Sequence, residues 1–143
     1  MRHTVPTGVY VLLLIFLIGL SAIIYRAVLA PPSQVIAFAG GGALIENYGH
    51  TILIDTGSDA SILRALGTTL LPWQRSIDLL VLTGTSSKER GGEAALRERY
   101  RILETIAFGP ATPDAPDPLP YGTPLQFGTM ILTVTAPGVY ALQ

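Results

Sequence analysis

The stretch His50–Gly67, HTILIDTGSDASILRALG, carries the pattern that decides the fold. Its first part, Thr51–Asp55, is a short apolar run typical of a buried strand. The Thr-Gly pair that follows breaks this strand. Ser58 or Asp59 can then cap an amphipathic helix, which we expect to end at Gly67. A strand that leads through a tight turn into a helix is the building unit of α/β sheets.

The same alternation continues toward the C-terminus. A connector over Leu70–Ile77 precedes a second buried run, Asp78–Thr83, which reads DLLVLT. A charged helix over Gly91–Arg99 and a third strand over Ile102–Phe108 follow. Strands that alternate with helices predict a parallel sheet with crossover helices.

The flanking segments have a different pattern. Val35–Phe38 and Ala43–Glu46, separated by a glycine triplet, predict a small antiparallel meander in front of the parallel strands. Pro110–Pro124 holds so many prolines that we expect an extended loop. A hairpin of Leu125–Phe127 and Met130–Thr135 is predicted after it. The predicted fold class is therefore α/β, in the form of an α+β half-sandwich.

The N-terminal segment is apolar. Gly8–Tyr25 carries no charge and lies between Arg2 and Arg26, and with its flanks it approaches the ~20 residues that cross a bilayer as a helix. Tyr10 and Tyr25 stand at its ends, where amphipathic rings favour the membrane interface. We expect a single-pass transmembrane anchor.

A cleaved signal peptide is the alternative, but Pro31 and Pro32 directly after the candidate cleavage site disfavour it. The expected organisation is an anchor over 1–30, a Pro-rich linker over 31–34 and one domain over 35–143. The basic residues around the anchor differ little between its two sides. We favour a cell-membrane protein with its N-terminus inside and its domain extracytoplasmic.

The charge of the chain bears on its partners. Without Arg2 and Arg26, seven of the nine basic residues remain against ten acidic ones, a net charge of about −3. This balance does not support binding to nucleic acid, which relies on a basic surface. Basic and acidic residues also alternate over the charged helix and its neighbours, with Glu93 and Arg97 spaced for an i, i+4 pair. A solvated helix face is the preferred interpretation of Lys88, Arg90, Arg97, Arg99 and Arg101, interleaved with Glu89, Glu93, Glu98 and Glu104.

Several phrases, taken in order, resemble a known family: VIAF with glycines and ALIE, HTILIDTGSDASILRALG, LPWQRSIDLLVLTG, GGEAALRERY and PLQFGTMILTVTAP. Together they resemble the metallo-β-lactamase-like domain of the ComEC proteins of bacterial DNA uptake (competence). The resemblance implies that 35–143 is the N-terminal half of an αββα metallo-β-lactamase-like fold. Gly57, Gly91 and Gly92 match glycines of the family motif.

The resemblance also shows where a metal site should stand, between the LVLT strand and the Gly91–Gly92 pair. The positions of the four expected ligands hold Gly84, Ser86, Lys88 and Glu89. Glycine has no ligand atom and lysine brings a positive charge, whereas catalytic zinc is held by imidazole, thiolate or carboxylate. The chain has no cysteine and only two histidines, His3 and His50. We therefore expect a pseudoenzyme with no metal and no cofactor, acting as an interaction or accessory module with a link to DNA uptake.

Two enzymatic alternatives remain open. Asp55-Thr56-Gly57 after an apolar strand resembles the catalytic turn of retroviral-type aspartic proteases, in which two subunits each supply one aspartate. A metal-dependent hydrolase with an atypical site is the other alternative. The preferred interpretation of Asp55 is structural, as a carboxylate that accepts backbone N–H groups of the turn that follows it.

A half-fold raises one further expectation. The missing second half of the fold would leave one face of the sheet apolar and uncovered. Such a face predicts a homodimer, or a contact with another membrane-associated protein.

Overall fold

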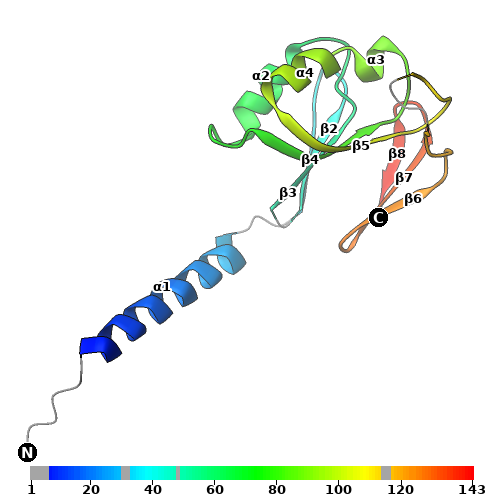
Figure 1. Ribbon diagram of the computed structural model, residues 1–143. Helices are drawn as coiled ribbons and strands as arrows, with labels where there is room; N and C mark the ends of the chain where they lie inside the picture. Colours follow the sequence, from blue (N-terminus) through cyan, green and yellow to red (C-terminus); the bar gives the residue numbers. More distant parts are fainter. Residues whose placement is uncertain (1–6, 30–32, 48, 114–116) are drawn as a thin grey trace, which may run out of the picture.

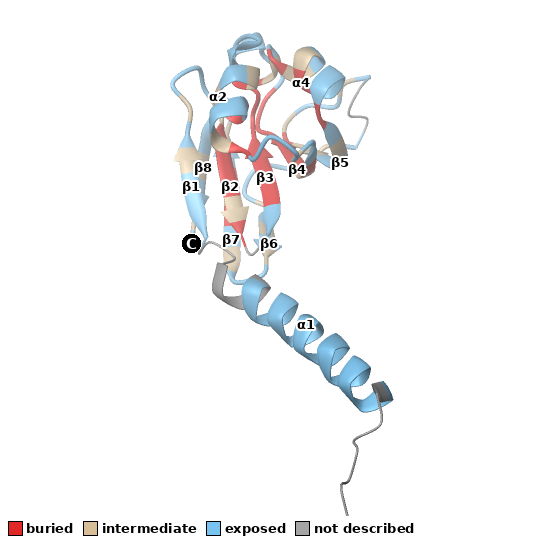
Figure 2. Cartoon of the chain, turned by 90° about the vertical axis from the view of Figure 1, so that its left-hand side faces the viewer, coloured by how far each residue is buried: buried red, intermediate tan, exposed pale blue. Residues whose placement is uncertain are grey.

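The computed structural model describes residues 7–29, 33–47, 49–113 and 117–143 and shows a long N-terminal helix followed by an α/β domain (Figure 1). Helix α1 spans Thr7–Leu29. Its Gly8–Tyr25 window is apolar and long enough to cross a membrane, and none of this window is buried (Figure 2). The prediction of an apolar spanning-length helix is confirmed. Arg2 lies outside the described residues, and Arg26 lies in the last turns of α1.

The domain is built on a five-stranded sheet in the order β1-β2-β3-β4-β5. Strands β1 to β3 pair antiparallel, and β3 to β5 pair parallel, so the predicted α/β class is confirmed. The strands are β1 (Gln34–Ala37), β2 (Ala43–Asn47), β3 (His50–Ile54), β4 (Ser76–Leu82) and β5 (Arg101–Ala107).

Three helices lie on one face of this sheet (Figure 1): α2 (Ser61–Thr69), α3 (Ser87–Arg90) and α4 (Glu93–Arg99). Leu66 of α2 and Leu96 of α4 pack with Leu44, Leu53 and Leu80 of the sheet in one core cluster. Three details differ from the prediction. Ala60 stands at the N-cap of α2 and makes no side-chain capping bond, whereas Ser58 or Asp59 was expected to cap this helix. The α2 helix continues through Gly67 to Thr69 because its pattern of buried residues extends to Leu70, and the short α3 helix was not predicted.

A second, three-stranded antiparallel sheet covers the other face. It consists of β6 (Pro124–Phe127), β7 (Met130–Ala136) and β8 (Val139–Leu142). Leu132 and Val134 of β7 are fully buried against Ile45, Ile54 and Val81 of the large sheet. In the described part of the chain the expected uncovered apolar face is therefore not found. Strand β8 completes this cover and was not predicted from the sequence.

The two ends of the large sheet differ in their surroundings. Helix α1 ends at Leu29 and β1 begins at Gln34, and five residues of extended chain span at most ~18 Å. We call the end of the sheet that holds Gln34 and the starts of β3, β4 and β5 the anchor-proximal edge. The opposite end, where β3 leads into Asp55 and β4 leads into Thr83, is the carboxyl edge.

Candidate functional site at the carboxyl edge

Asp55 and Thr83 are the residues that follow two neighbouring parallel strands. Asp55 is the one non-glycine residue with a positive φ in the described chain, 55°, a conformation that aspartate tolerates better than most residues. This backbone conformation comes directly after β3, and the Asp55 side chain is bonded to Thr83. Its Oδ1 accepts the Thr83 backbone N–H at 2.7 Å, and its Oδ2 accepts the Thr83 hydroxyl at 2.6 Å.

Asp55 was expected to accept backbone N–H groups of the turn that follows it, and this prediction was correct about the acceptor and wrong about the donor. The carboxylate does accept a backbone N–H, but from the end of the adjacent strand β4 and not from its own turn. Because β3 and β4 are parallel neighbours, both strands reach the same edge and their first following residues meet there.

Thr83 connects this pair to the C-terminal sheet. Its hydroxyl oxygen accepts the backbone N–H of Gly138, in the turn between β7 and β8, at 2.7 Å. Its carbonyl oxygen accepts the Tyr121 hydroxyl at 3.0 Å. The Tyr121 ring stacks on Phe108 with 6.4 Å between centroids. Asp55 and Thr83 therefore join three segments that are far apart in the sequence.

The Ser86–Glu89 segment closes the other side of the site. The Glu89 carbonyl accepts both the backbone N–H of Thr56 at 2.7 Å and its hydroxyl at 3.1 Å. The Glu89 side chain is 9% exposed and accepts a short hydrogen bond from the Ser86 hydroxyl. It also occupies the space beside Gly84, where an added Cβ would come within 3.2 Å of the Glu89 carboxyl carbon.

The motif glycines permit the close packing around these residues. A Cβ on Gly91 would lie 2.1 Å from the Ser58 carbonyl oxygen, and one on Gly92 would lie 2.6 Å from the Thr56 carbonyl oxygen. Gly57 has a positive φ of 72° and lies against the carbonyl of Gly40 in the glycine triplet. The site thus depends on backbone segments that only glycine allows to approach so closely.

The electrostatics of the edge are dominated by acidic and phenolic groups. Burial raises the pKa of Asp55 above its usual value of 3.8, hydrogen bonds from Thr83 oppose this rise, and the charge of Glu89 adds to it. Burial also raises the pKa of Tyr121, and the charges of Glu89 and Asp55 contribute. The pKa of Tyr140 is raised by burial and by Asp55.

The structure brings most of the predicted motif positions together. Gly84, Ser86 and Glu89 lie at the carboxyl edge with Asp55, whereas the Lys88 side chain is exposed. Within the described residues, no group of three or more His, Cys, Asp or Glu side chains is placed to hold a metal ion. The arrangement holds the ends of the strands together. Its two carboxylates, those of Asp55 and Glu89, are hydrogen-bonded to Thr83 and Ser86.

Thr83, Tyr121 and Gly138 also belong to this site and were not predicted from the sequence. Thr83 could have been found, because a polar residue directly after an apolar strand often lies at a functional edge in parallel sheets. Tyr121 and Gly138 gave no such signal, since they reach the site only through the packing of the second sheet.

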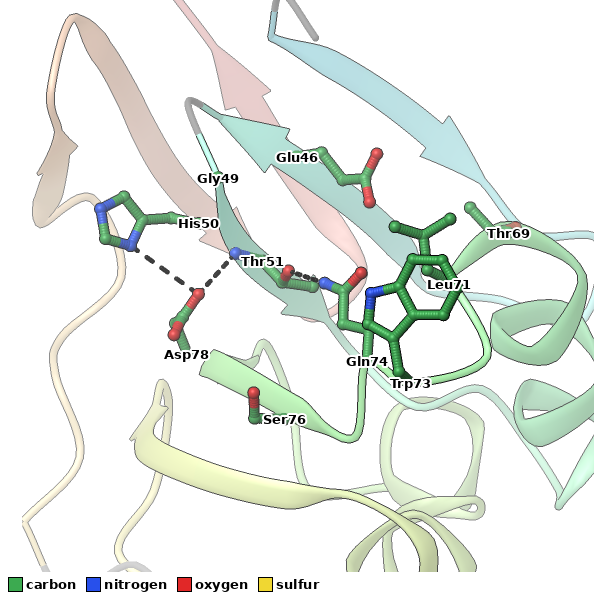
Figure 3. Close-up of a pocket in the computed structure, with 10 residues that line it drawn as sticks. All are labelled: Glu46, Gly49, His50, Thr51, Thr69, Leu71, Trp73, Gln74, Ser76 and Asp78. Atoms are coloured by element: carbon green, nitrogen blue, oxygen red, sulfur yellow. Dashed lines mark hydrogen bonds and ion pairs between the residues drawn. The ribbon is translucent and has the colours of Figure 1, made fainter. Parts of the chain in front are cut away.

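A pocket of about 530 Å³ lies at the other end of the sheet, on the anchor-proximal edge (Figure 3). His50, which was expected to be an exposed turn residue, is exposed and begins β3, with its Nδ1 3.7 Å from a carboxylate oxygen of Asp78. The same Asp78 oxygen accepts the Thr51 backbone N–H at 2.7 Å. Trp73 forms one wall of this pocket.

In comparisons with known proteins, no family model matches this chain and no curated protein is significantly similar to it.

Proposed function

We propose that this chain holds a non-catalytic metallo-β-lactamase-like domain at a membrane, where the domain acts as an interaction or accessory module. The family resemblance suggests DNA uptake as its context, and a cell membrane with the domain on the extracytoplasmic side as its place. The observation that carries the non-catalytic part is the use of the Asp55 carboxylate, both of whose oxygens accept hydrogen bonds from Thr83.

The anchoring part is supported by α1. A helix whose Gly8–Tyr25 window has a mean hydropathy of 2.5 and no buried residue has no partner within the described chain for its apolar surface. A bilayer satisfies both its length and its apolar side chains. Washing membranes with alkaline carbonate should leave the full chain in the pellet, and release into the supernatant would contradict anchoring.

The absence of metal chemistry is supported by residue type at the family's ligand positions. Gly84 offers no donor, the exposed Lys88 is cationic, and the Glu89 carboxylate is hydrogen-bonded to Ser86. A single carboxylate does not supply the three protein ligands of a catalytic zinc site.

The test is metal binding by the purified full chain. The protein is incubated in detergent with Zn²⁺, Mn²⁺ or Fe²⁺ and desalted, and its bound metal and its hydrolysis of phosphodiester and β-lactam reporters are measured. We expect metal far below one equivalent and no hydrolysis above the buffer rate. Glu89→Gln removes the carboxylate, and Lys88→Gln in the same short helix is the matched control. Near-stoichiometric metal that Glu89→Gln abolishes and Lys88→Gln retains would refute the proposal.

The geometry does not favour the dimeric aspartic protease. That mechanism needs two aspartates to share a proton and activate water between two subunits. Asp55 is only 4% exposed, and the β7–β8 turn packs over its partner Thr83.

The proposed partner contact also needs a different surface from the one that the sequence suggested. The second sheet covers the apolar face that was expected to support a homodimer or a membrane-associated partner. A partner of this domain would therefore bind at another surface, such as an edge, the helical face or the outer face of the second sheet.

A further inference from the structure

The turn between α2 and β4 exposes two large apolar side chains. Leu71 is 54% exposed and Trp73, the sole tryptophan of the chain, is 76% exposed. Both line the anchor-proximal pocket, and Figure 3 shows the Trp73 ring beside Leu71. A tryptophan is usually buried in large part, so this degree of exposure needs an explanation.

The turn is held in place by hydrogen bonds. The Gln74 backbone N–H donates to the Leu71 carbonyl at 2.9 Å, and the Gln74 side-chain amide donates to the Thr51 hydroxyl at 2.7 Å. The Arg75 carbonyl accepts the backbone N–H of Arg101 at 2.8 Å. These bonds fix the turn to the starts of β3 and β5, and the Trp73 ring is exposed on a firmly held backbone.

Contacts on the anchor-proximal edge place this turn near the end of α1. Trp73 shares its pocket with Glu46, whose carboxylate accepts the Gln34 side-chain amide at 2.6 Å. Gln34 is the fifth residue after Leu29, so the linker holds this edge within ~18 Å of the end of the helix. Where α1 crosses a bilayer, this short linker keeps the edge that holds the pocket and Trp73 close to the headgroups of that same bilayer.

The chemistry of the edge suits a lipid surface. Tryptophan prefers the membrane interface, because its ring is apolar and its indole N–H can bond to headgroups and water. Three exposed arginines lie at the same edge: Arg75 before β4, Arg99 at the end of α4 and Arg101 at the start of β5. The negative surface potential of an anionic membrane attracts such arginines. The two acidic residues that line the pocket, Glu46 and Asp78, are only partly exposed and are bonded to Gln34, Thr51 and His50, while the exposed Glu98 beside Arg99 offsets part of the positive charge.

We propose that Leu71 and Trp73 insert into the headgroup region of the bilayer that holds α1, so that the domain rests on lipid through its anchor-proximal edge. This proposal rests on the anchoring part of the proposed function and is independent of its catalytic part. In this arrangement the domain has a fixed orientation relative to the membrane, and its carboxyl edge points away from the bilayer.

The test uses the intrinsic fluorescence of Trp73 in the full chain, reconstituted in phosphatidylcholine–phosphatidylglycerol vesicles. Because no other tryptophan contributes, the emission reports this site alone. We expect a blue-shifted emission that is quenched when brominated phosphatidylcholine replaces the ordinary lipid. Leu71→Ser should reduce this quenching. Val139→Ser is the matched control, because Val139 is 55% exposed and begins β8 beside the carboxyl edge, and it should leave the quenching unchanged.

Three results would overturn the proposal. Emission at the wavelength of water-exposed tryptophan, without quenching by brominated lipid, would show a domain held off the surface. A blue shift that brominated lipid does not quench would show Trp73 packed against protein, such as a second copy. Failure of the chain to float with the vesicles would refute both the membrane anchoring and the docking. Flotation without quenching would refute the docking alone.

Discussion

Asp55 shows how a single residue can look catalytic in sequence and be structural in the fold. Its carboxylate follows a buried strand and precedes Thr-Gly, which is the pattern that suggested a protease turn. In the structure this carboxylate is the acceptor that joins β3 to β4 through Thr83. The sequence could predict that Asp55 accepts hydrogen bonds. It could not predict their donor, because the donor comes from strand pairing and not from neighbouring residues.

The pH dependence of stability tests the environment of Asp55. Burial raises its pKa above 3.8 in the folded chain, so between that value and the folded pKa the native state binds more protons than the unfolded state. Ionisation of Asp55 should therefore lower the free energy of unfolding as the pH rises through this window. In urea titrations of the full chain in detergent, the stability of the wild type relative to Asp55→Asn should fall as the pH rises above about 3.8.

The same urea titrations can also contradict the raised pKa of Asp55. A stability difference that increases with pH would mean that hydrogen bonding outweighs burial and that the pKa of Asp55 is lowered. Asp59 serves as the control acid, because it is exposed and its carboxylate accepts the backbone N–H of Ser61 at the start of α2. Asp59→Asn should not reproduce the effect, since the hydrogen bonds of Asp59 lower its pKa.

At the scale of elements, glycines that look alike in the sequence have two different roles: one lies inside a helix with free space around it, and another permits a close contact with the backbone. Gly67 lies inside α2 with no atom within 4 Å of an added Cβ, while a Cβ on Gly91 would collide with the Ser58 carbonyl at 2.1 Å. Gly67→Ala should stabilise the domain by up to ~1 kcal/mol, because alanine is the better helix former. Gly91→Ala should destabilise it by ~1–3 kcal/mol or more, since the backbone has to move.

Both substitutions are read from urea midpoints of the full chain in detergent. They change a glycine to alanine in or beside a short helix, so each is the control for the other. Equal effects from the two would contradict the packing of the α3–α4 segment against the 56–59 loop. The sequence predicted Gly91 and Gly92 as motif glycines but placed Gly67 as a helix end, because glycine in both roles has the same local signature.

Most element types were predictable, and the misses have physical causes. Strands β3 and β4 are buried on both faces and read as continuous apolar runs, which identified them directly. Strand β8 is four residues long with alternating exposed and intermediate positions, and it carries little hydrophobic signal of its own. Helix α3 also spans only four residues, and Ser86 caps it by accepting the Lys88 backbone N–H.

At the scale of the whole molecule, the second sheet changes the expectation about partners. Leu132 is fully buried between the two sheets, whereas its neighbour Ile131 is 37% exposed. Leu132→Ala should lower the free energy of unfolding by about 2–5 kcal/mol, because it opens a cavity between the layers. Ile131→Ala should cost much less. Comparable losses in denaturation experiments would contradict the packing of β7 on the large sheet.

The packing of the two sheets lay beyond the reach of the sequence. The hairpin of β6 and β7 was predicted, but which face of the large sheet it covers depends on the path of the Pro-rich segment before it. Without that path, a half-fold with an open face was the natural expectation. The buried residues Leu132 and Val134, spaced two apart on β7, were the signal that this strand packs on an apolar partner.

The parallel strands run from the anchor-proximal edge to the carboxyl edge, so their length sets the distance between these two edges. Strand β4 has seven residues, and at ~3.3 Å per residue it separates the two edges of the sheet by roughly 20 Å. A domain standing on its anchor-proximal edge would present the loops around Thr83 and Gly138 at about that height above the headgroups. An integral membrane protein without a projecting domain could not reach those loops. A partner that binds there would therefore be a soluble protein or a membrane protein with a domain that extends above the headgroups.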